Sequence, residues 1–299
     1  MTDARDRAIY WAYRTGAAAA NAVPGVIGEP VARSFGRALS FAMPARRKMS
    51  SRHIQRASHG DLKGLALERA VTTAFDSYAR YWLEMFRLPN ASKETIRKYL
   101  MCDGYEHVEA ALAAGKGAIF ALPHLGGWEF AGAWMWAAKQ QRLLVVVEAL
   151  EPPELFEWFV QLRSSMGMEV VAAGPDTATR VLRALRDNRI VCLVSDRDLS
   201  GDGVEVEFFG ERTTLPGGPA MLALRSGAPI FPVAAYFTDK RLHRAVVRPA
   251  LDTTRQGKLR DDVARITQDL ARNFEALISA APQQWHLMQP NWPSDRGFL

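Results

Sequence analysis

From residue 106 onward, the sequence alternates short, continuously apolar runs with segments of helical periodicity. The runs 118–122, 143–147 and 190–194 contain no charged or hydrogen-bonding side chain apart from one cysteine. A strand that is apolar at every position has to be covered on both faces. Such strands separated by helices are typical of a mostly parallel central sheet flanked by helices on both faces. The sequence therefore predicts an α/β fold.

The expected elements follow one another at short intervals. Strands are predicted at 118–122, 143–147, 169–173, 190–194, 204–209, 229–237 and 244–247. Helices are predicted at 106–116, 130–139, 153–165, 177–187, 219–225 and 261–278. A helical pattern also covers about 60–100, where Phe75, Tyr78, Trp82 and Met85 recur on one face. Such a stripe would pack against a core or line a groove for an apolar chain.

The N-terminal segment 1–60 carries the whole excess of positive charge. The chain has a net charge of +6, while this segment alone has ten basic and three acidic residues, or +7. No apolar stretch reaches the ~18 residues that a membrane-spanning helix needs. The sequence therefore divides into a basic amphipathic N-terminal region, 1–60, and an α/β domain, 61–299.

Apolar, aromatic and basic residues together suggest that region 1–60 binds a membrane. Ile9, Tyr10, Trp11 and Tyr13 are residues that settle at a bilayer interface. A basic cluster that would attract anionic headgroups consists of Arg46, Arg47, Lys48, Arg52 and Arg56. The alternative is an ordinary surface helix followed by a solvated basic loop. Nucleic acid is not an expected partner, because no reader motif accompanies the basic residues.

Metal and disulfide chemistry find little support in the sequence. Cys102 and Cys192 are too few and too far apart for a disulfide framework or a zinc site. Neither a His-Glu-x-x-His motif nor a phosphate-binding Walker loop is present. We therefore expect a reducing compartment, no metal and no resident cofactor.

A histidine stands where the first apolar strand ends. The run Ala-Leu-Pro-His-Leu-Gly-Gly-Trp-Glu places His124 directly after that strand and closes with Glu129. Open α/β sheets bind ligands at the carboxyl edge of their strands. Gly126 and Gly127 would allow a substrate to approach the backbone. A neutral histidine held by a carboxylate can accept the proton of a hydroxyl that attacks a thioester.

Several further motifs follow in order. They are Glu148-x-x-x-Pro152, Arg163 with Gly167, Val194-Ser195-Asp196-Arg197-Asp198, Phe208-Phe209-Gly210, 217–223, 227–229 and 283–290. Together with His124-x-x-x-x-Glu129, they resemble the bacterial lipid acyltransferases, the superfamily of glycerolipid and lipid A late acyltransferases. The resemblance covers roughly residues 70–293. The motif Asp-Arg-Asp-Leu at 196–199 and the basic N-terminus are most similar to those of the actinobacterial phosphatidylinositol mannoside acyltransferases. In that subfamily, Asp would be expected at the position of Glu129.

The resemblance implies roles for particular residues. His124 would be the general base, and Glu129 and Asp198 compete to orient it. Asp198 is the preferred partner across the sheet edge, with Asp196 second. Arg163 would bind a phosphate or the thioester oxygen. The residues implied in substrate binding are Arg163, Gly126, Gly127, Glu148, Asp196, Arg197 and Arg225, the last also explained by the dipole of the helix that it closes.

The resemblance also implies a reaction. Acyl-CoA, as co-substrate, would donate a long-chain acyl group to a hydroxyl of a membrane glycolipid, most simply a mannose of phosphatidylinositol mannoside. The backbone around Gly126 and Gly127, or Arg163, would stabilise the oxyanion. The enzyme would be peripheral, on the cytoplasmic face of the plasma membrane, where the anionic surface is a further partner. Two alternatives stay open: an acyl-thioester hydrolase, and a non-catalytic lipid-binding protein.

Overall fold

The computed structural model describes residues 4–238 and 241–298. The helices are α1 (Ala4–Ala22), α2 (Gly25–Ala42), α3 (Pro44–Ala57), α4 (Gly64–Arg87), α5 (Lys93–Lys98), α6 (Tyr105–Ala113), α7 (Trp128–Lys139), α8 (Pro153–Ser165), α9 (Thr177–Arg186), α10 (Gly218–Ser226) and α11 (Leu259–Ser279). The strands are β1 (Leu100–Asp103), β2 (Ala118–Leu122), β3 (Leu143–Val147), β4 (Met168–Ala172), β5 (Ile190–Val194), β6 (Val204–Phe208), β7 (Glu211–Leu215), β8 (Ile230–Phe237) and β9 (His243–Val247). Short 3-10 turns occur at Leu88–Asn90, Pro282–Gln284 and Pro293–Asp295.

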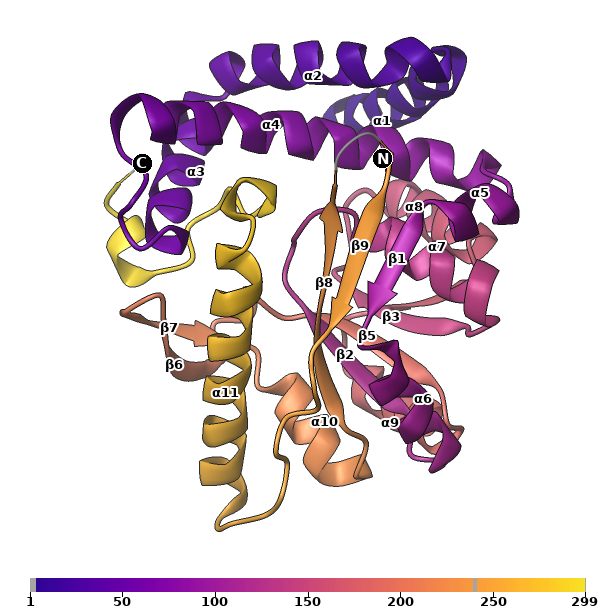
Figure 1. Ribbon diagram of the computed structural model, residues 1–299, viewed down its shortest axis with the longest axis vertical. Helices are drawn as coiled ribbons and strands as arrows, with labels where there is room; N and C mark the ends of the chain where they lie inside the picture. Colours follow the sequence, from indigo (N-terminus) through magenta and orange to yellow (C-terminus); the bar gives the residue numbers. More distant parts are fainter. Residues whose placement is uncertain (1–3, 239–240, 299) are drawn as a thin grey trace.

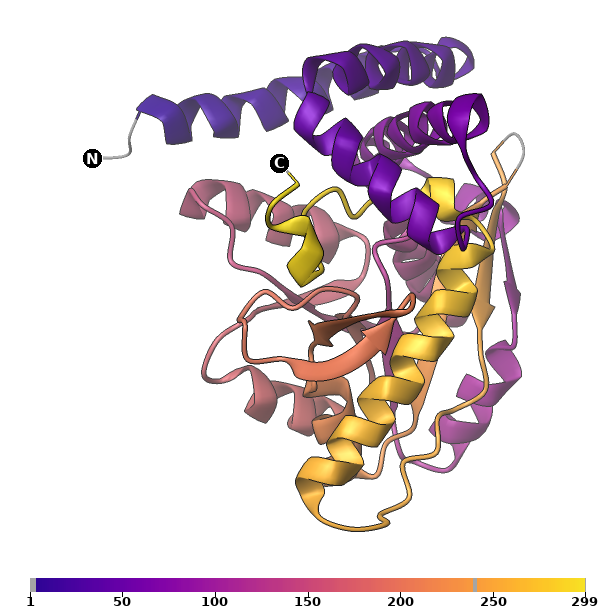
Figure 2. The same ribbon diagram turned by 90° about the vertical axis from the view of Figure 1, so that its left-hand side faces the viewer.

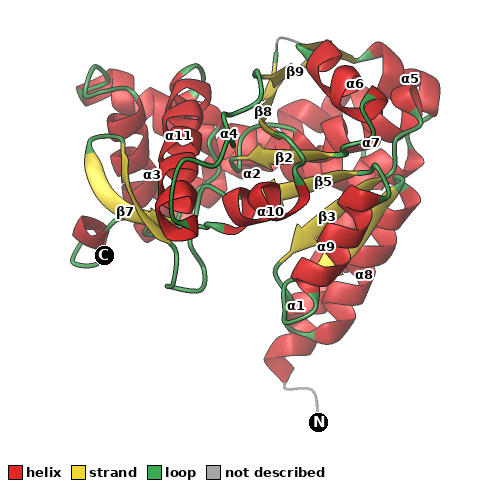
Figure 3. Cartoon of the chain, turned by 90° about the horizontal axis from the view of Figure 1, so that it is seen from below, coloured by secondary structure: helices red, strands yellow, loops and turns green. Residues whose placement is uncertain are grey.

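A seven-stranded sheet in the order β1-β9-β8-β2-β5-β3-β4 forms the centre of the molecule (Figure 1). Strands β8, β2, β5, β3 and β4 pair in parallel, whereas β9 runs antiparallel to β8 and β1 is parallel to β9. Figure 3 shows β2, β5 and β3 side by side with helices around them. The prediction of a mostly parallel sheet flanked by helices is confirmed.

The alternation of side chains along the strands divides the interior into two cores. In β2, Ile119 and Ala121 contact the core beneath α9, α10 and α11. The intervening Ala118 and Phe120 contact the other core, beneath α4, α6, α7 and α8. Because successive strand residues point to opposite faces, a strand that is apolar throughout serves both cores at once.

The predicted strands and helices agree with the structure to within about two residues in most places. The sequence missed β1, which is only four residues long and lies at the edge of the sheet. It also missed β7, which pairs with β6 in a separate two-stranded hairpin. The segment Glu211–Leu215 carries Glu, Arg and two Thr residues, and this polar content hides it from a search for apolar runs.

The N-terminal region forms three helices that pack against the rest of the fold. Helix α2 lies along α4, and Figure 2 shows the N-terminal end of α1 projecting beyond the other helices. Gly36 allows the close approach of α2, because a side chain there would collide with the backbone of Phe75 on α4. The basic residues 46–56 lie on α3, so the alternative interpretation of a solvated basic loop is wrong.

None of the described helices is both long and apolar enough to cross a membrane.

A buried histidine joins α3 to the C-terminal segment. The Nε2 atom of His53 lies 2.8 Å from the carbonyl oxygen of Gln289. Burial lowers the pKa of His53 to about 4, although the hydrogen bond to Gln289 and the charge of Asp295 act in the opposite direction. The ring is therefore neutral in the folded protein at neutral pH.

We expect His53 to make folding sensitive to acid. An unfolded histidine has a pKa near 6.5, so between pH 6.5 and 4 the unfolded chain binds more protons and the free energy of unfolding falls as the pH falls. From pH 7 to pH 5 the loss due to this residue is about 2 kcal/mol. Chemical denaturation at both pH values should show a loss smaller by about that amount in His53→Gln than in the wild type. The control His107→Gln, an exposed position on α6, should keep the wild-type loss, and equal losses in all three proteins would contradict the prediction.

Candidate functional site

The centre of the site is a histidine hydrogen-bonded to a buried carboxylate. His124 follows β2, and Asp196 follows the adjacent parallel strand β5 at the same edge of the sheet. The Nδ1 atom of His124 lies 2.7 Å from Oδ1 of Asp196, and its backbone N–H donates to Oδ2 at 3.0 Å. The carboxylate is fully buried, whereas the side chain of His124 is 40% exposed. The imidazole is thus held at Nδ1 by the buried carboxylate, while part of the ring remains exposed to solvent.

Asp196 is ionised although it is buried. Burial alone would raise its pKa, but the charge of His124 and hydrogen bonds from His124 and Trp285 outweigh burial and lower the pKa below its ordinary value. The indole Nε1–H of Trp285 donates to Oδ2 at 2.7 Å. Both carboxylate oxygens therefore accept hydrogen bonds, and a neutral imidazole must carry its proton on Nδ1, leaving Nε2 as the acceptor.

The expectation that Asp198 holds His124 is wrong, because Asp198 organises its own loop. Its Oδ1 accepts hydrogen bonds from the backbone of Ser200 and Gly201, and its Oδ2 from Gly203 and the hydroxyl of Thr214. These donors use both carboxylate oxygens and join the loop to β7. The partner is Asp196, which the sequence had ranked second.

Glu129 does not contact the ring of His124 either. It lies in the first turn of α7, where its Oε1 accepts hydrogen bonds from Nε and Nη2 of Arg163 at 3.0 and 2.7 Å. The hydroxyl of Tyr81 donates to the same oxygen at 3.4 Å. Both side chains of the ion pair are largely buried, with exposed fractions of 6% for Glu129 and 15% for Arg163. Glu129 thus balances the charge of a largely buried arginine.

The two glycines have a backbone role. The N–H of Gly126 donates to the carbonyl of Gln284 at 2.9 Å, and that of Gly127 to the carbonyl of Ala235 at 2.8 Å. Gly126 has φ of +61°, and a side chain there would collide with the Ala235 carbonyl. Because both amides already donate to backbone carbonyls, neither is free in this structure to hold an oxyanion, the role that the sequence had suggested for them.

A cavity of about 410 Å³ adjoins His124 on the α4, α7 and α8 side of the sheet. Its floor is the face of the central sheet that lies beneath α4, α6, α7 and α8, and this face includes Phe120 and Val145. Many aliphatic side chains line the cavity, and the aromatic side chains of its walls are Tyr78, Tyr81, Trp82, Tyr105, Trp128, Trp134, Phe156 and Phe159. The polar and charged lining residues are His124, Glu129, Glu148, Arg163, Arg197, His286 and Gln289. The cavity is therefore an apolar space with a few polar groups beside the histidine, as small-molecule sites usually are.

Arg197 and Arg225, the other two arginines that the sequence suggested for substrate binding, differ in position. Arg197 follows Asp196 and lines the cavity. Its side chain makes no hydrogen bond or ion pair with any other residue in the described ranges, 4–238 and 241–298. Arg225 is exposed at the C-terminal end of α10 and does not line the cavity. Strand β8 follows α10, so Arg225 lies at the opposite edge of the sheet from His124, and its expected place in the site is wrong.

His286, which the sequence suggested to be structural or at the surface, is buried and lines the cavity. Its backbone N–H donates to the carbonyl of His124 at 2.8 Å, and its Nε2 lies 2.8 Å from the hydroxyl of Ser77 on α4. Burial, and then the charge of His124, lower the pKa of His286 to about 3, so the ring is neutral. Trp285 and His286 lie in the run 283–290, whose aromatic content was the one available signal of their role.

Within the described part of the chain, no group of three or more His, Cys, Asp or Glu side chains is arranged to hold a metal ion.

Comparison with known proteins points to one family. The family model for the bacterial lipid A biosynthesis acyltransferases matches residues 2–294. A protein named phosphatidylinositol mannoside acyltransferase from Mycobacterium tuberculosis (strain H37Rv) is 43% identical over 227 residues, which cover 74% of this chain and 70% of that protein.

Two other relatives are similar over nearly the same span. The phosphatidylinositol mannoside acyltransferase of Mycolicibacterium smegmatis is 41% identical over 228 residues, covering 75% of this chain and 73% of that protein. The lipid A biosynthesis acyltransferase of Haemophilus influenzae is 23% identical over 222 residues, covering 73% and 67%.

The pair formed by Glu129 and Arg163 should be important for stability. Glu129→Gln leaves a buried guanidinium without a counter-charge, and we expect the free energy of unfolding to fall by about 3 kcal/mol. Denaturant titration would measure the loss. The control is Glu109→Gln, which breaks an exposed ion pair with Lys139 and should cost less than about 1 kcal/mol. Similar losses in the two variants would show that burial does not decide the effect.

Proposed function

The chain belongs to the bacterial lipid A biosynthesis acyltransferase family, and on that premise we propose that it moves a long-chain acyl group from acyl-CoA to a hydroxyl of a membrane glycolipid. The most similar relatives reported above are named for phosphatidylinositol mannoside, so a mannose of that glycolipid is the proposed acceptor. Acyl-CoA is the proposed donor and co-substrate, with no metal or resident cofactor.

One observation carries the proposed mechanism: the partly exposed imidazole of His124 is hydrogen-bonded through Nδ1 to the buried carboxylate of Asp196. His124 Nε2 accepts the proton of the acceptor hydroxyl while its oxygen attacks the thioester carbon. Asp196 holds the Nδ1–H tautomer and stabilises the imidazolium that forms. The carbon–sulfur bond breaks, and the coenzyme A thiolate leaves and takes the proton from His124. The acyl ester and free thiol are the products.

The cavity beside His124 suits an acyl chain. Its aromatic and aliphatic walls lie against the carboxyl edge of β2, β3 and β5, next to the reacting group. Each methylene buried there contributes about 0.8 kcal/mol, so a long chain gains substantial binding energy. We therefore propose that the chain lies in this cavity with its thioester at the ring of His124.

Cationic groups at the cavity have separate proposed roles. We propose that Arg163, which is oriented by Glu129 and lines the cavity, stabilises the negative charge that develops on the thioester oxygen. Arg197 has no partner among the described side chains, which leaves its guanidinium available for a phosphate of either substrate. Glu148 follows β3 and lines the cavity, where we propose that it contacts a sugar hydroxyl.

We propose that the protein binds the membrane through α2, as a peripheral protein on the cytoplasmic face. Small residues, including Ala32 and Gly36, face α4, while Ile27, Val31 and Phe35 are 51%, 50% and 63% exposed. These three large apolar residues recur every four positions and so form one stripe. Water-exposed helices normally turn such a stripe inward, whereas a bilayer interface favours it outside.

The residues first expected at the membrane divide between two roles. Tyr13 packs against Trp82 and Phe159, and Ile9 and Tyr10 contact the same core, whereas Trp11 is exposed. In the basic cluster, Arg47 pairs with Glu68, and Arg52 and Arg56 pair with Asp295. These pairs leave less charge for anionic headgroups than the sequence suggested, so we propose that apolar insertion of α2 supplies most of the affinity.

An acyl-thioester hydrolase is the main competing function, because the same base could activate water. A transfer assay distinguishes the two activities. With labelled acyl-CoA, the proposed enzyme needs a glycolipid acceptor for rapid turnover and places the label in that lipid, whereas a hydrolase releases fatty acid at the same rate without acceptor.

Substitutions at the proposed dyad should separate Asp196 from Asp198. We expect His124→Ala and Asp196→Asn each to lower the rate of acyl transfer by about 10²–10⁴-fold, because each removes the base or its ionised partner. Asp198→Asn alters only a loop carboxylate and should keep the rate within about tenfold. The rates would be measured with saturating acyl-CoA and phosphatidylinositol mannoside. A larger loss in Asp198→Asn than in Asp196→Asn would reject the proposed pair.

Vesicle flotation should test the stripe on α2. We expect Val31→Asp/Phe35→Asp to weaken binding to anionic vesicles by about tenfold or more, because charges replace apolar side chains at the interface. The control Leu259→Asp changes another exposed apolar residue, on α11, and should bind like the wild type. Raising the salt concentration should weaken binding only in part. Complete loss at high salt, or equal binding by all variants, would contradict apolar insertion.

A further inference from the structure

We propose that the C-terminal segment 285–298, here called the strap, fixes the orientation of Asp196, with Trp285 and Asn291 as positioning residues. The inference rests on the proposed function, since it concerns the partner of the proposed base. It adds two residues that do not line the cavity, and they belong to a segment distant in sequence from the strand that precedes Asp196.

The strap contacts Asp196 at two atoms. The indole Nε1–H of Trp285 donates to Oδ2 at 2.7 Å. The side-chain amide of Asn291 donates to the backbone carbonyl of Asp196 at 3.0 Å. One bond thus holds the carboxylate and the other holds the main chain that bears it. The remaining contacts of the carboxylate are the two from His124.

Asp196 needs such support because it lies beyond the end of its strand. The last bond that continues the pairing of β2 with β5 is from the N–H of Ser195 to the carbonyl of Leu122. After it the chain enters the loop that leads to β6. A catalytic group is held closely only when its own orientation is fixed by surrounding hydrogen bonds. The strap supplies them where the sheet no longer does.

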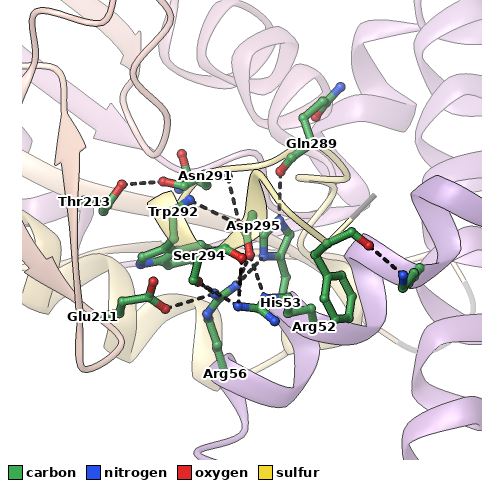
Figure 4. A network of polar contacts seen from close by, with 12 residues as sticks. Arg52, His53, Arg56, Glu211, Thr213, Gln289, Asn291, Trp292, Ser294 and Asp295 are labelled. Atoms are coloured by element: carbon green, nitrogen blue, oxygen red, sulfur yellow. Dashed lines mark hydrogen bonds and ion pairs between the residues drawn. The ribbon is translucent and has the colours of Figure 1, made fainter.

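The strap is itself anchored by a buried aspartate (Figure 4). Oδ1 of Asp295 accepts hydrogen bonds from Arg52 at 2.7 Å and Arg56 at 2.8 Å, both on α3. Oδ2 accepts the backbone N–H groups of Asn291 and Trp292 at 3.0 and 3.1 Å. One fully buried carboxylate therefore joins α3 to the turn that presents Asn291.

Contacts on the opposite side hold the strap against the β6–β7 hairpin. The indole Nε1–H of Trp292 donates to the carbonyl of Phe208 at 3.0 Å. The hydroxyl of Thr213 donates to the carbonyl of Asn291. Arg56 also pairs with Glu211 of the hairpin at 3.0 Å. With α3 on one side and the hairpin on the other, the strap has little freedom to move away from Asp196.

Two tryptophans of the strap provide a matched comparison. Trp285 and Trp292 are 2% and 1% exposed, and each donates one indole hydrogen bond to a buried oxygen. Only Trp285 donates to Asp196. Trp285→Phe and Trp292→Phe therefore remove the same group in the same segment, but only the first removes it from the proposed dyad.

We expect Trp285→Phe to lower kcat by about tenfold or more with KM for acyl-CoA nearly unchanged, because a hydrogen bond to a charged group is lost. Trp292→Phe removes one of several anchors of the strap and leaves those of Asp295 and Thr213, so it should keep kcat within about twofold. In an Asp196→Asn background, Trp285→Phe should cause almost no further loss, since the two residues act as a unit. Asn291→Ala should likewise lower kcat without raising KM. Equal losses in the two tryptophan variants, or the full loss repeated in the Asp196→Asn background, would overturn the proposal.

A spectroscopic readout separates failure of this inference from failure of the proposed function. In protein labelled with ¹⁵N-histidine, the Nδ1–H proton of His124, assigned by its absence in His124→Ala, reports the bond to Asp196 without turnover. Its resonance should shift or broaden in Trp285→Phe and remain at the wild-type position in Trp292→Phe. If the wild type transfers no acyl group and this pattern is still seen, the strap is supported and the function rejected. An unchanged resonance in Trp285→Phe rejects the strap.

Discussion

The bond between His124 Nδ1 and the buried carboxylate of Asp196 is the interaction on which the rest of the site depends. A buried carboxylate is tolerated only when hydrogen bonds and positive charge compensate for lost hydration. Here the compensation comes from His124 itself and from Trp285. Because Oδ1 of Asp196 accepts the hydrogen bond from Nδ1, the interaction that stabilises the buried charge also leaves Nε2 of a neutral His124 ring without a proton.

The parallel sheet brings these groups together. Strands β2, β3 and β5 end at the same edge, and they are followed by His124, Glu148 and Asp196 respectively. One face of the same strands forms the floor of the apolar cavity. The carboxyl edge of a parallel sheet therefore places His124 beside an apolar cavity, an arrangement that is compatible with membership of an acyltransferase family.

Much of the fold could be predicted because its strands are apolar throughout. The bounds of β2, β3 and β5 agree with the predicted ranges, since a buried strand between helices has few alternatives. The polar hairpin strand β7 and the short edge strand β1 were missed, because neither shows a continuous apolar run. The sequence also did not single out the exposed apolar residues of α2, because periodicity alone does not tell which face of a helix packs against α4.

The sequence by itself determined the fold class, the place of His124 at a strand end and the family motifs around it. Only the tertiary structure decided which acid meets the ring. Glu129 is close in sequence, but α7 directs it to Arg163, and Asp198 uses its oxygens to close a loop. Asp196 meets the ring because β5 lies beside β2, and Trp285 and Asn291, 89 and 95 positions later in the strap, donate to its carboxylate and its backbone carbonyl. The spacing of residues in the sequence tells where a side chain is attached along the backbone. Its hydrogen-bond partners depend on distant segments that only folding brings together.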